Sequence, residues 1–414
     1  MPNHKSLILF AVASAMMFVF LATASPAFAA SSEQTLYSFC SGGSRCPDGG
    51  APSGGLVFDA AGNLYGTVNI GGANAWGAVF ELSPNGGKWT EQVIYSFCSN
   101  SGCSDGSYPA SGVVFDTAGN LYGTTFSGGD YGEGTVFELM PNNGMWTEKV
   151  LHSFGEGNDG TGPEAGLVID ANGNLYGTTF FGGAYHGGMV FELMPNNGTW
   201  TEKALHWFKR DGEGGSYPNA TPILDKSGNV YGTTAYGGNY RHGTVFELTP
   251  ANRYWMEKAL HSFNTDSKGG YAPTGGVILD GSGNLYGTTS GGGIYNGGTA
   301  FELFHSNGTW TLNVMIAFKP TKLEVPGPNG LVLGKSGNVY GTTFNGGVYS
   351  KGSVFELIPN NGKWTENVLF SFNDAADAPF WPDSGLVLDT SGNLYGTTSA
   401  GGTYNDGTVF EVTP

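Results

Sequence analysis

The residues best suited to bind a ligand lie in glycine-rich loops between repeated segments. Tyrosine recurs in these loops, whereas tryptophan, histidine, arginine and acidic residues occupy them in single copies. Aromatic rings stack on sugars and on other ligands that combine apolar faces with hydroxyl groups. The candidate ligand-binding residues are therefore Trp76, Tyr131, Tyr185, His186, Tyr240, Arg241, His242, Tyr295, Tyr349, Trp381, Asp383 and Tyr404.

The recurrent tyrosines also have a structural interpretation. They occupy the same loop position in six of seven copies, and Asn74 replaces tyrosine in the first. Each ring could instead pack over its own Gly-Gly turn. Residues that differ between copies are the stronger binding candidates, because a ligand needs a given contact once.

No catalytic residue is predicted. The sequence contains no H-E-x-x-H or phosphate-loop motif. Its one G-x-S-x-G match, at 102–106, overlaps the second cysteine pair and does not join a strand to a helix, so no nucleophile elbow is expected. A lyase or lactonase could still assemble its site from single residues, and for that alternative His186 and His242 lie in equivalent loops. Three other histidines share a position that holds tyrosine, isoleucine or phenylalanine in other copies, which indicates packing: His152, His206 and His261.

No cofactor or metal site is expected. The segment D-x-x-G-N could be a calcium loop, but it has one acidic residue per copy, which favours a turn held by its own aspartate. The four cysteines form two close pairs, each after a Y-S-F-C segment. This spacing predicts disulfides Cys40–Cys46 and Cys98–Cys103, and a metal site is the alternative.

One segment recurs along the whole chain and organises all of these residues. Its tyrosine, in G-N-(L/V)-Y-G-T, returns at intervals of 54 to 57 residues: Tyr65, Tyr122, Tyr176, Tyr231, Tyr286, Tyr340 and Tyr395. A glutamate in G-x-(V/A)-F-E-(L/V) follows each: Glu81, Glu138, Glu192, Glu247, Glu302, Glu356 and Glu411. Because a catalytic residue is needed once, these glutamates are expected to accept structural hydrogen bonds. A fixed long period means that one structural unit is copied.

Each copy contains four strand candidates, named a to d here. In the second copy, strand a is 112–116, which is apolar enough to predict burial on both faces. The N-L-Y-G-T-T strand (b) and the T-V-F-E-L strand (c) follow, and an Asn-Gly pair predicts a tight hairpin before strand d at 146–154. Four short antiparallel strands form one propeller blade.

The two ends of the chain complete the count of strands. Residues 32–39 align with strand d, whereas the chain ends after a strand c at 409–412. The sequence therefore predicts an all-β, seven-bladed β-propeller over residues 30–414, closed by the N-terminal strand in the last blade. The b–c and d–a loops must share one face, which we call the loop face, and only there do the copies differ.

The N-terminus and the composition predict the location and the class of partner. Residues 1–29 have the apolar run and the small residues of a signal peptide, so a secreted monomer without a membrane span is expected. The formal net charge is −17 over 414 residues, and no lysine or arginine cluster is present, which argues against nucleic-acid partners.

The strings D-x-x-G-N-L-Y-G-T-T, G-G-x-Y-x-x-G-T-V-F-E-L and L-H-S-F, with a D-G…P…G loop, resemble the Gloeo/Verruco (GloVer) tandem repeat. The turn between strands a and b is more loosely similar to NHL and gluconolactonase-like propellers. The first resemblance implies an exported bacterial protein and no particular reaction. We therefore expect a binding protein for a glycan or a cell-surface protein, with a structural surface scaffold and a propeller enzyme as alternatives.

Overall fold

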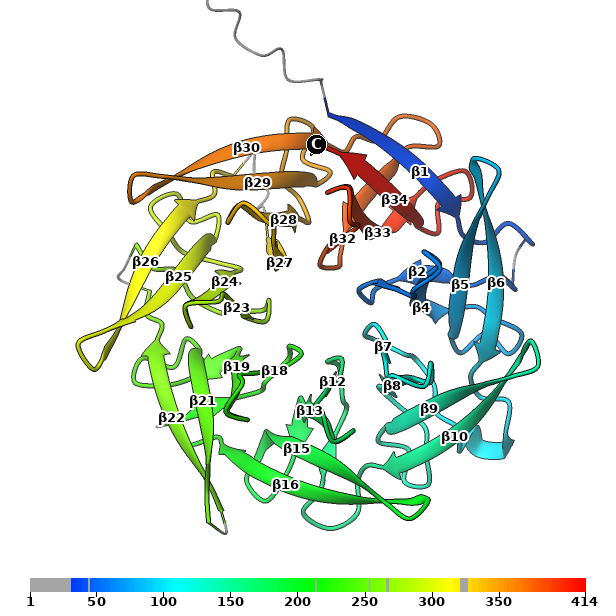
Figure 1. The fold of residues 1–414 in the computed structure, drawn as a ribbon, viewed down its shortest axis with the longest axis horizontal. Coiled ribbons are helices and arrows are strands. Elements are labelled where there is room, and N and C mark those ends of the chain that lie inside the picture. The colour runs from blue at the N-terminus through cyan, green and yellow to red at the C-terminus, as the bar shows by residue number, and fades with distance from the viewer. Residues whose placement is uncertain (1–30, 44, 213, 253, 266–267, 321–326) are drawn as a thin grey trace, which may run out of the picture. The chain divides into compact units, whose positions relative to one another are not determined.

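The computed structural model describes residues 31–43, 45–212, 214–252, 254–265, 268–320 and 327–414. The predicted signal peptide, residues 1–29, lies outside them. The described residues form an all-β ring of seven antiparallel blades, as predicted from the repeats (Figure 1). None of the described helices is long and apolar enough to cross a membrane.

The first four blades follow the order of the chain, from the centre of the ring outwards. Their strands are β2 (Gly50–Pro52), β3 (Val57–Phe58), β4 (Leu64–Ile70), β5 (Ala78–Asn85) and β6 (Lys88–Ser96); β7 (Val114–Phe115), β8 (Leu121–Thr125), β9 (Thr135–Asn142) and β10 (Met145–Ser153); β12 (Val168–Ile169), β13 (Leu175–Thr179), β15 (His186–Asn196) and β16 (Thr199–Lys209); β18 (Ile223–Leu224), β19 (Val230–Thr234), β21 (Thr244–Ala251) and β22 (Tyr254–Ser262).

The remaining blades are β23 (Ile278–Leu279), β24 (Leu285–Thr289), β25 (Thr299–Ser306) and β26 (Thr309–Ala317); β27 (Pro328–Leu333), β28 (Val339–Thr343), β29 (Ser353–Asn360) and β30 (Lys363–Ser371); β31 (Pro379–Pro382), β32 (Val387–Leu388), β33 (Leu394–Gly401), β34 (Thr408–Thr413) and β1 (Ser32–Ser38). Two short ladders join loops, β11 (Gly160–Thr161) with β14 (Phe181–Gly182) and β17 (Gly215–Ser216) with β20 (Tyr236–Gly237), and η1 (Ser101–Cys103) is a single 3₁₀ turn.

The N-terminal strand closes the ring, as the alignment of the two chain ends predicts. Strand β1 pairs antiparallel with β34 from Ser32 opposite Thr413 to Ser38 opposite Thr408. Figure 1 shows β1 on the outer side of the last blade, beside the C-terminus. The last blade therefore has its outermost strand, and its edge is not left open.

Neighbouring blades are joined by a repeated pair of phenylalanines. Phe97 in the segment after β6 packs edge-to-face on Phe137 of the next blade, at 5.0 Å between ring centroids. The same contact crosses the closing seam, where Phe39 after β1 meets Phe80 at 5.0 Å. Gly66 of the Y-G-T motif lies beneath this ring, because a Cβ on it would come within 2.7 Å of Phe80 Cζ.

The residues of the repeated motifs form the turns that were predicted for them. Asn143 and Gly144 have φ angles of 52° and 81°, as the hairpin between β9 and β10 requires. The Asp116 carboxylate accepts hydrogen bonds from the backbone N–H groups of Ala118 and Asn120 and from the Asn120 side chain. The prediction of an aspartate-held turn is confirmed.

The recurrent glutamate also has the predicted structural role. The Tyr122 hydroxyl donates to Glu138 Oε1 at 2.9 Å, between strands β8 and β9 of one blade. Glu138 is only 8% exposed, so the tyrosine supplies a donor to a carboxylate that water hardly reaches.

The prediction that strand a is buried on both faces is wrong. Strand β7 contains only Val114 and Phe115, and both are half-buried. The reason is the position of this strand, since the innermost strand of a blade borders the central channel. The preceding Val113 is 8% exposed and supplies the buried contact.

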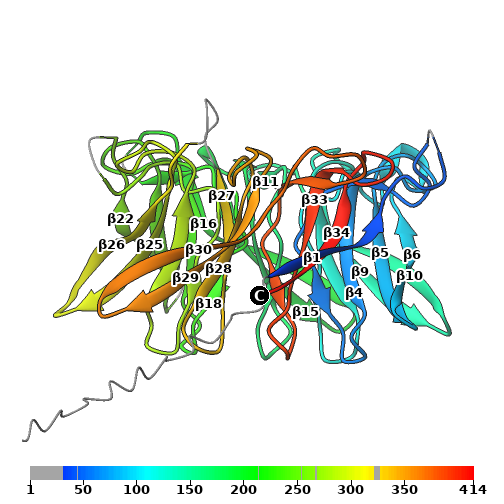
Figure 2. The ribbon, with the colours of Figure 1, turned by 90° about the horizontal axis from the view of Figure 1, so that it is seen from above.

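The b–c and d–a connections share one face, along the upper edge in Figure 2. Backbone contacts between them fix this arrangement. Tyr108 N–H, in the d–a connection, donates to Trp76 O in the b–c loop of the preceding blade, at 2.9 Å.

Candidate functional site

A proline near the centre of the ring positions one variable residue in each blade. The residue before each proline has a left-handed φ, including Tyr108 (56°), Tyr217 (60°) and Trp381 (59°). This conformation is costly for residues other than glycine, so the surrounding hydrogen bonds must hold it. The residues that follow the seven prolines are Ser53, Ala110, Glu164, Asn219, Thr274, Asn329 and Asp383.

These seven residues, which we call the channel ring, line the central channel. With the small residues after them they surround a cavity of about 340 Å³ to which every blade contributes. Threonines of the second strands hold this inner wall together across blades. Thr67 Oγ1 donates to Ser111 O at 2.7 Å, and Thr124 Oγ1 donates to Ala165 O at 2.9 Å.

The channel opens on the loop face into a second cavity of about 440 Å³. Its polar walls come from the channel ring and from Asn69, and its aromatic walls are Tyr108 and Phe126. A cavity with carboxyl groups, amides, hydroxyls and aromatic rings can bind a ligand that has both hydroxyl groups and apolar faces. We call this cavity the channel mouth.

Two carboxyl groups give the channel mouth its acidity. Burial raises the pKa of the Glu164 carboxyl above its ordinary value, and it raises the pKa of Asp383 to about 6. The Asp383 side chain is exposed to water in the channel, yet the seven blades surround it, so water solvates the charge incompletely.

Two further oxygens in the ring are available to a ligand. Asn219 Oδ1 and Ser53 Oγ are buried and have no hydrogen-bond partner among the described residues. Asn329, in contrast, is used by the fold, because its side-chain N–H group donates to Pro382 O at 2.8 Å. Buried polar atoms without partners are rare, and a ligand donor would satisfy them.

Of the residues predicted from sequence, Asp383 belongs to the channel mouth. Trp76 and Trp381 lie on the loop face in aromatic contacts. Trp76 meets Tyr108 of the mouth at 5.0 Å, and Trp381 stacks on Phe344 at 5.7 Å with an interplanar angle of 14°.

The recurrent tyrosines do not converge on one site. They are exposed, and two of them lie against a lysine at the end of the outermost strand of their own blade or just after it. Lys209 Nζ lies 5.4 Å from the centroid of the Tyr185 ring, and Lys319 Nζ lies 4.8 Å from that of Tyr295. The other exposed members of this set are Tyr131, Tyr240, Tyr349 and Tyr404. Their role in binding stays a prediction.

The remaining candidates lie apart from the channel mouth. His186 is exposed at the start of β15, and His242 lies 5.8 Å from Tyr271 in the next connection. Among the described residues these two histidines form no hydrogen bond or ring contact with each other. Arg241 lines a separate cavity of about 280 Å³ with Tyr217 and Tyr236.

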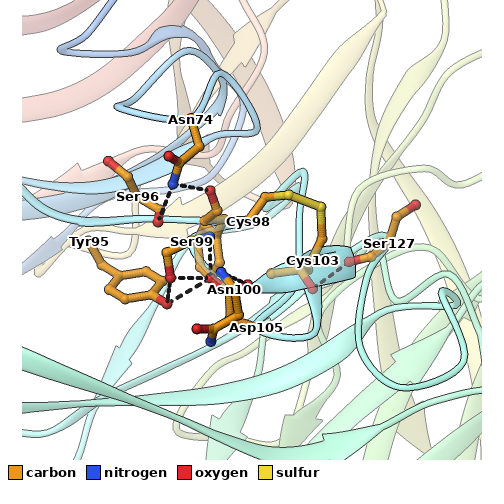
Figure 3. The surroundings of a disulfide bond; sticks show 11 residues. Asn74, Tyr95, Ser96, Cys98, Ser99, Asn100, Cys103, Asp105 and Ser127 are labelled. Carbon is orange, nitrogen blue, oxygen red and sulfur yellow. Dashed lines mark hydrogen bonds between the residues drawn. A yellow bond between two sulfur atoms is a disulfide. The ribbon is translucent and has the colours of Figure 1, made fainter.

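The two predicted disulfides are present, Cys40–Cys46 and Cys98–Cys103. Figure 3 shows the second, which closes the start of the d–a connection around η1. Beside it the buried Asp105 carboxylate accepts hydrogen bonds from the Tyr95 hydroxyl and the Ser99 N–H group, both at 2.8 Å. The loops are thus held covalently and by a buried charge.

The position of Tyr95 corrects the prediction that this site in the repeat serves only packing. Tyr37, Tyr95 and His152 each form a hydrogen bond with an aspartate of the following connection. His152 Nε2 lies 2.8 Å from Asp159 Oδ2. In the copies with isoleucine or phenylalanine this bond is lost.

In the described part of the chain, one group of three potential metal ligands lies close together: Cys40, Cys46 and Asp406. The two sulfur atoms are bonded to each other, so they are not free thiolates. This group therefore does not have the chemistry of a metal site.

Six channel-ring residues were missed from the sequence. One feature of the sequence could have identified them: the residue directly after the repeated proline varies between otherwise similar copies. Because each copy supplies a single residue and its type varies from copy to copy, none forms a motif by itself.

Several solved propellers have a similar fold. Virginiamycin B lyase from Staphylococcus aureus, in a catalytically inactive variant with quinupristin, is 14% identical with a TM-score of 0.57, over 93% of this chain and 99% of the other. The extracellular domain of a putative one-component system from B. thetaiotaomicron is 12% identical with a TM-score of 0.53, over 87% and 38%. A putative 6-phosphogluconolactonase from Bacteroides uniformis is 14% identical with a TM-score of 0.50, over 78% and 84%.

These likenesses are too distant to show more than the fold. No curated protein matches the chain. The Gloeobacter/Verrucomicrobia repeat matches residues 51–278 and 218–414, which together span nearly all of the ring. The chain belongs to the Gloeobacter/Verrucomicrobia repeat family.

Proposed function

We propose that this protein is an exported binding protein that takes a carbohydrate-like ligand at the channel mouth. The observation that carries the proposal is the channel ring, where seven otherwise similar blades present carboxyl, amide, hydroxyl and apolar side chains to one cavity. Repetition is expected of a scaffold, whereas variation at one converging position is expected of a site.

The composition of the mouth suggests the class of ligand. Glu164 and Asp383 can accept hydrogen bonds from sugar hydroxyls, as can the free oxygens of Asn219 and Ser53. Tyr108 and Phe126 supply apolar faces. An anionic ligand is disfavoured by the two carboxyl groups, which points to a neutral sugar or to one that carries amines.

Export is part of the same proposal. The two disulfides are typical of proteins that fold in an oxidising compartment, and the N-terminal residues have the composition of a signal peptide. The exposed tyrosines, with Trp76, His186, Arg241, His242 and Trp381, would then form an outer surface around the mouth for a longer glycan or a cell-surface protein.

An enzyme is the second candidate. A carboxyl group with a pKa near neutrality in a concave site is suited to general acid–base catalysis, and Asp383 has a pKa of about 6. The lyase and the putative lactonase with similar folds make lactones and esters the substrates to test. A structural scaffold at the cell surface is the remaining alternative.

The test is a glycan array with the mature chain, with and without calcium, followed by calorimetry on any sugar that binds. Replacing both carboxyl groups, Glu164→Gln with Asp383→Asn, should weaken binding at least about tenfold, since hydrogen bonds to charged groups contribute roughly 1.5–3 kcal/mol each. Asp374→Asn is the matched control, because Asp374 is an exposed acid in the connection after β30.

Three results would count against the proposal. Binding that survives the double change but is lost in His186→Ala or Arg241→Ala would move the site to the outer loops. Turnover of lactones or esters that Asp383→Asn abolishes would favour the enzyme. If no glycan binds and no lactone or ester is turned over, a structural scaffold is favoured.

A further inference from the structure

One contact between blades is repeated in six places and missing from the seventh. A tryptophan at the start of each internal strand d covers the Y-G-T tyrosine of the preceding blade, as Trp146 covers Tyr65 at 6.1 Å and Trp364 covers Tyr286 at 6.1 Å. Corresponding tryptophans are Trp89, Trp200, Trp255 and Trp310.

The strand that closes the ring has no such tryptophan. Trp146 pairs with Pro141 across its hairpin, and the last described pair of β1 and β34 is Ser32 with Thr413. One step further, the position that corresponds to tryptophan is Ser31, opposite Pro414. The closing strand therefore has a small hydroxyl side chain at the position of the indole, and the Ser31 hydroxyl donates to Leu369 O of the sixth blade.

The burial of the tyrosines reflects this loss. The other six Y-G-T tyrosines are 4–6% exposed, whereas Tyr340 is half-buried. The apolar cluster around Tyr340 contains Val332 and Leu388, the same kind of wall as in the other blades, but no indole ring.

A second substitution occurs at the same place. The turn aspartate that accepts a hydrogen bond from the other tyrosines is Gly334 in this copy. The Tyr340 ring uses the space, because a Cβ on Gly334 would lie 2.7 Å from Tyr340 Cε2. The Tyr340 hydroxyl donates to Glu356 at 2.9 Å.

A cavity of about 510 Å³ lies beside Tyr340, between the a–b turns of the sixth and seventh blades, and we call it the seam pocket. Its apolar walls are Leu333, Tyr340 and Leu388, and its polar lining includes Ser336 and Ser391. At its edge Lys335 Nζ donates to Thr390 O at 2.8 Å and so joins the two turns. The pocket is formed by a–b turns, so it lies on the face opposite the channel mouth.

We propose that the seam pocket binds a planar aromatic group of the size of indole. Six equivalent sites in the same ring are filled by an indole on the same tyrosine, and the seventh has the walls without the ring. Aromatic contacts of this kind contribute beyond the area they bury. The hydroxyl groups of Ser336 and Ser391 can accept a hydrogen bond from an indole N–H group. The site is independent of the proposed function.

The ring could come from a free small molecule or from a tryptophan side chain of another protein. Binding to the mature chain is therefore measured by calorimetry with three probes: indole, the peptide Gly-Lys-Trp-Thr-Glu, which copies the repeat, and the same peptide with alanine for tryptophan. We expect the first two to bind and the third not to. Equal affinity of the first two indicates a small aromatic compound, and a peptide that binds at least about tenfold more tightly indicates a protein segment.

Ser31→Trp should fill the pocket, weaken indole binding at least about tenfold and raise the melting temperature. Ser31→Ala is the matched control and should leave indole binding unchanged. If Ser31→Trp does not fold, a crystal of the unmodified chain soaked with indole must show the ring beside Tyr340. The proposal is overturned if neither aromatic probe binds, if folded Ser31→Trp binds indole as the unmodified chain does, or if the soaked ring lies elsewhere.

Discussion

The side chains of this protein divide into those that every blade repeats and those that differ. Tyr176 represents the first kind. Its hydroxyl lies 3.0 Å from Glu192 Oε1 and 3.3 Å from Asp170 Oδ2, and Glu192 is 7% exposed. The Tyr176 hydroxyl thus lies within hydrogen-bond distance of two carboxylates of its own blade. This explains why tyrosine, glutamate and aspartate recur together.

Tyr176→Phe should lower the free energy of unfolding by about 1–3 kcal/mol, because the buried Glu192 carboxylate loses a donor while the ring is kept. Chemical denaturation measures the change. Tyr236→Phe is the control, since Tyr236 is 55% exposed. An equal loss in both variants, or none in Tyr176→Phe, would show that the hydroxyl is not a structural contact.

The second kind is represented by Asp383. It occupies the same backbone position as Ser53, Ala110 and Thr274, so the fold accepts charged, polar and apolar side chains there. A position that the scaffold does not constrain, yet that points into a shared cavity, is free to be adapted to a ligand.

At the scale of elements, the outermost strands and the d–a connections share buried acidic groups. Burial, together with the nearby charges of Asp48, Asp105 and Asp159, raises the pKa of Glu91 to about 8 and the pKa of Glu148 and Glu202 to about 7. One carboxyl oxygen of each glutamate is buried without a partner among the described residues. The neutral acid is therefore the form that the folded protein favours.

This arrangement predicts a loss of stability at alkaline pH. A carboxyl group whose pKa is higher in the folded state stabilises the fold fully below its unfolded pKa of roughly 4.3, and this contribution is lost as the pH rises through 7 to 8. The melting temperature should fall between pH 5 and pH 9, and less steeply in Glu91→Gln, which cannot ionise.

The control for this pH series is Glu133→Gln, since Glu133 is an exposed acid. It removes the same formal charge and so corrects for general repulsion in an acidic protein. If the two variants lose stability in parallel with the unmodified chain, the buried glutamates do not cause the pH dependence.

At the scale of the whole molecule, the ring depends on contacts between the two ends of the chain. The ladder of β1 with β34 joins residues 370 or more positions apart, and Phe39 carries the blade-to-blade contact across the seam. These contacts form only when all seven blades are in place, because closure aligns the first strand with the last.

Deleting residues 31–39 should therefore cause aggregation or a large fall in melting temperature, since β34 would become an exposed edge. A milder change, Phe39→Ala, should cost about 3–5 kcal/mol of unfolding free energy, and Phe154→Ala at the equivalent position inside the ring should cost a similar amount. A truncated chain that melts like the mature protein would contradict closure by β1.

The sequence by itself determined the repeat, the blade and the way the ring closes. Each of these depends on local chemistry: the Asn-Gly hairpin at Asn143, the aspartate turn at Asp116 and the cysteine pairs all act within a few residues. The orphan strands at the two ends then leave one way to complete seven blades. Alternation of strand direction also identified the loop face correctly.

Only the tertiary structure decided which variable residues share a cavity. The channel ring takes one residue from each repeat, and neither their side-chain direction nor their convergence is visible until the blades are placed around an axis. The recurrent tyrosines were attractive in sequence for the opposite reason, since repetition is easy to see, but the fold spreads them around the rim. The seam pocket likewise lies between the a–b turns of the sixth and seventh blades, whose residues come together only in the folded ring.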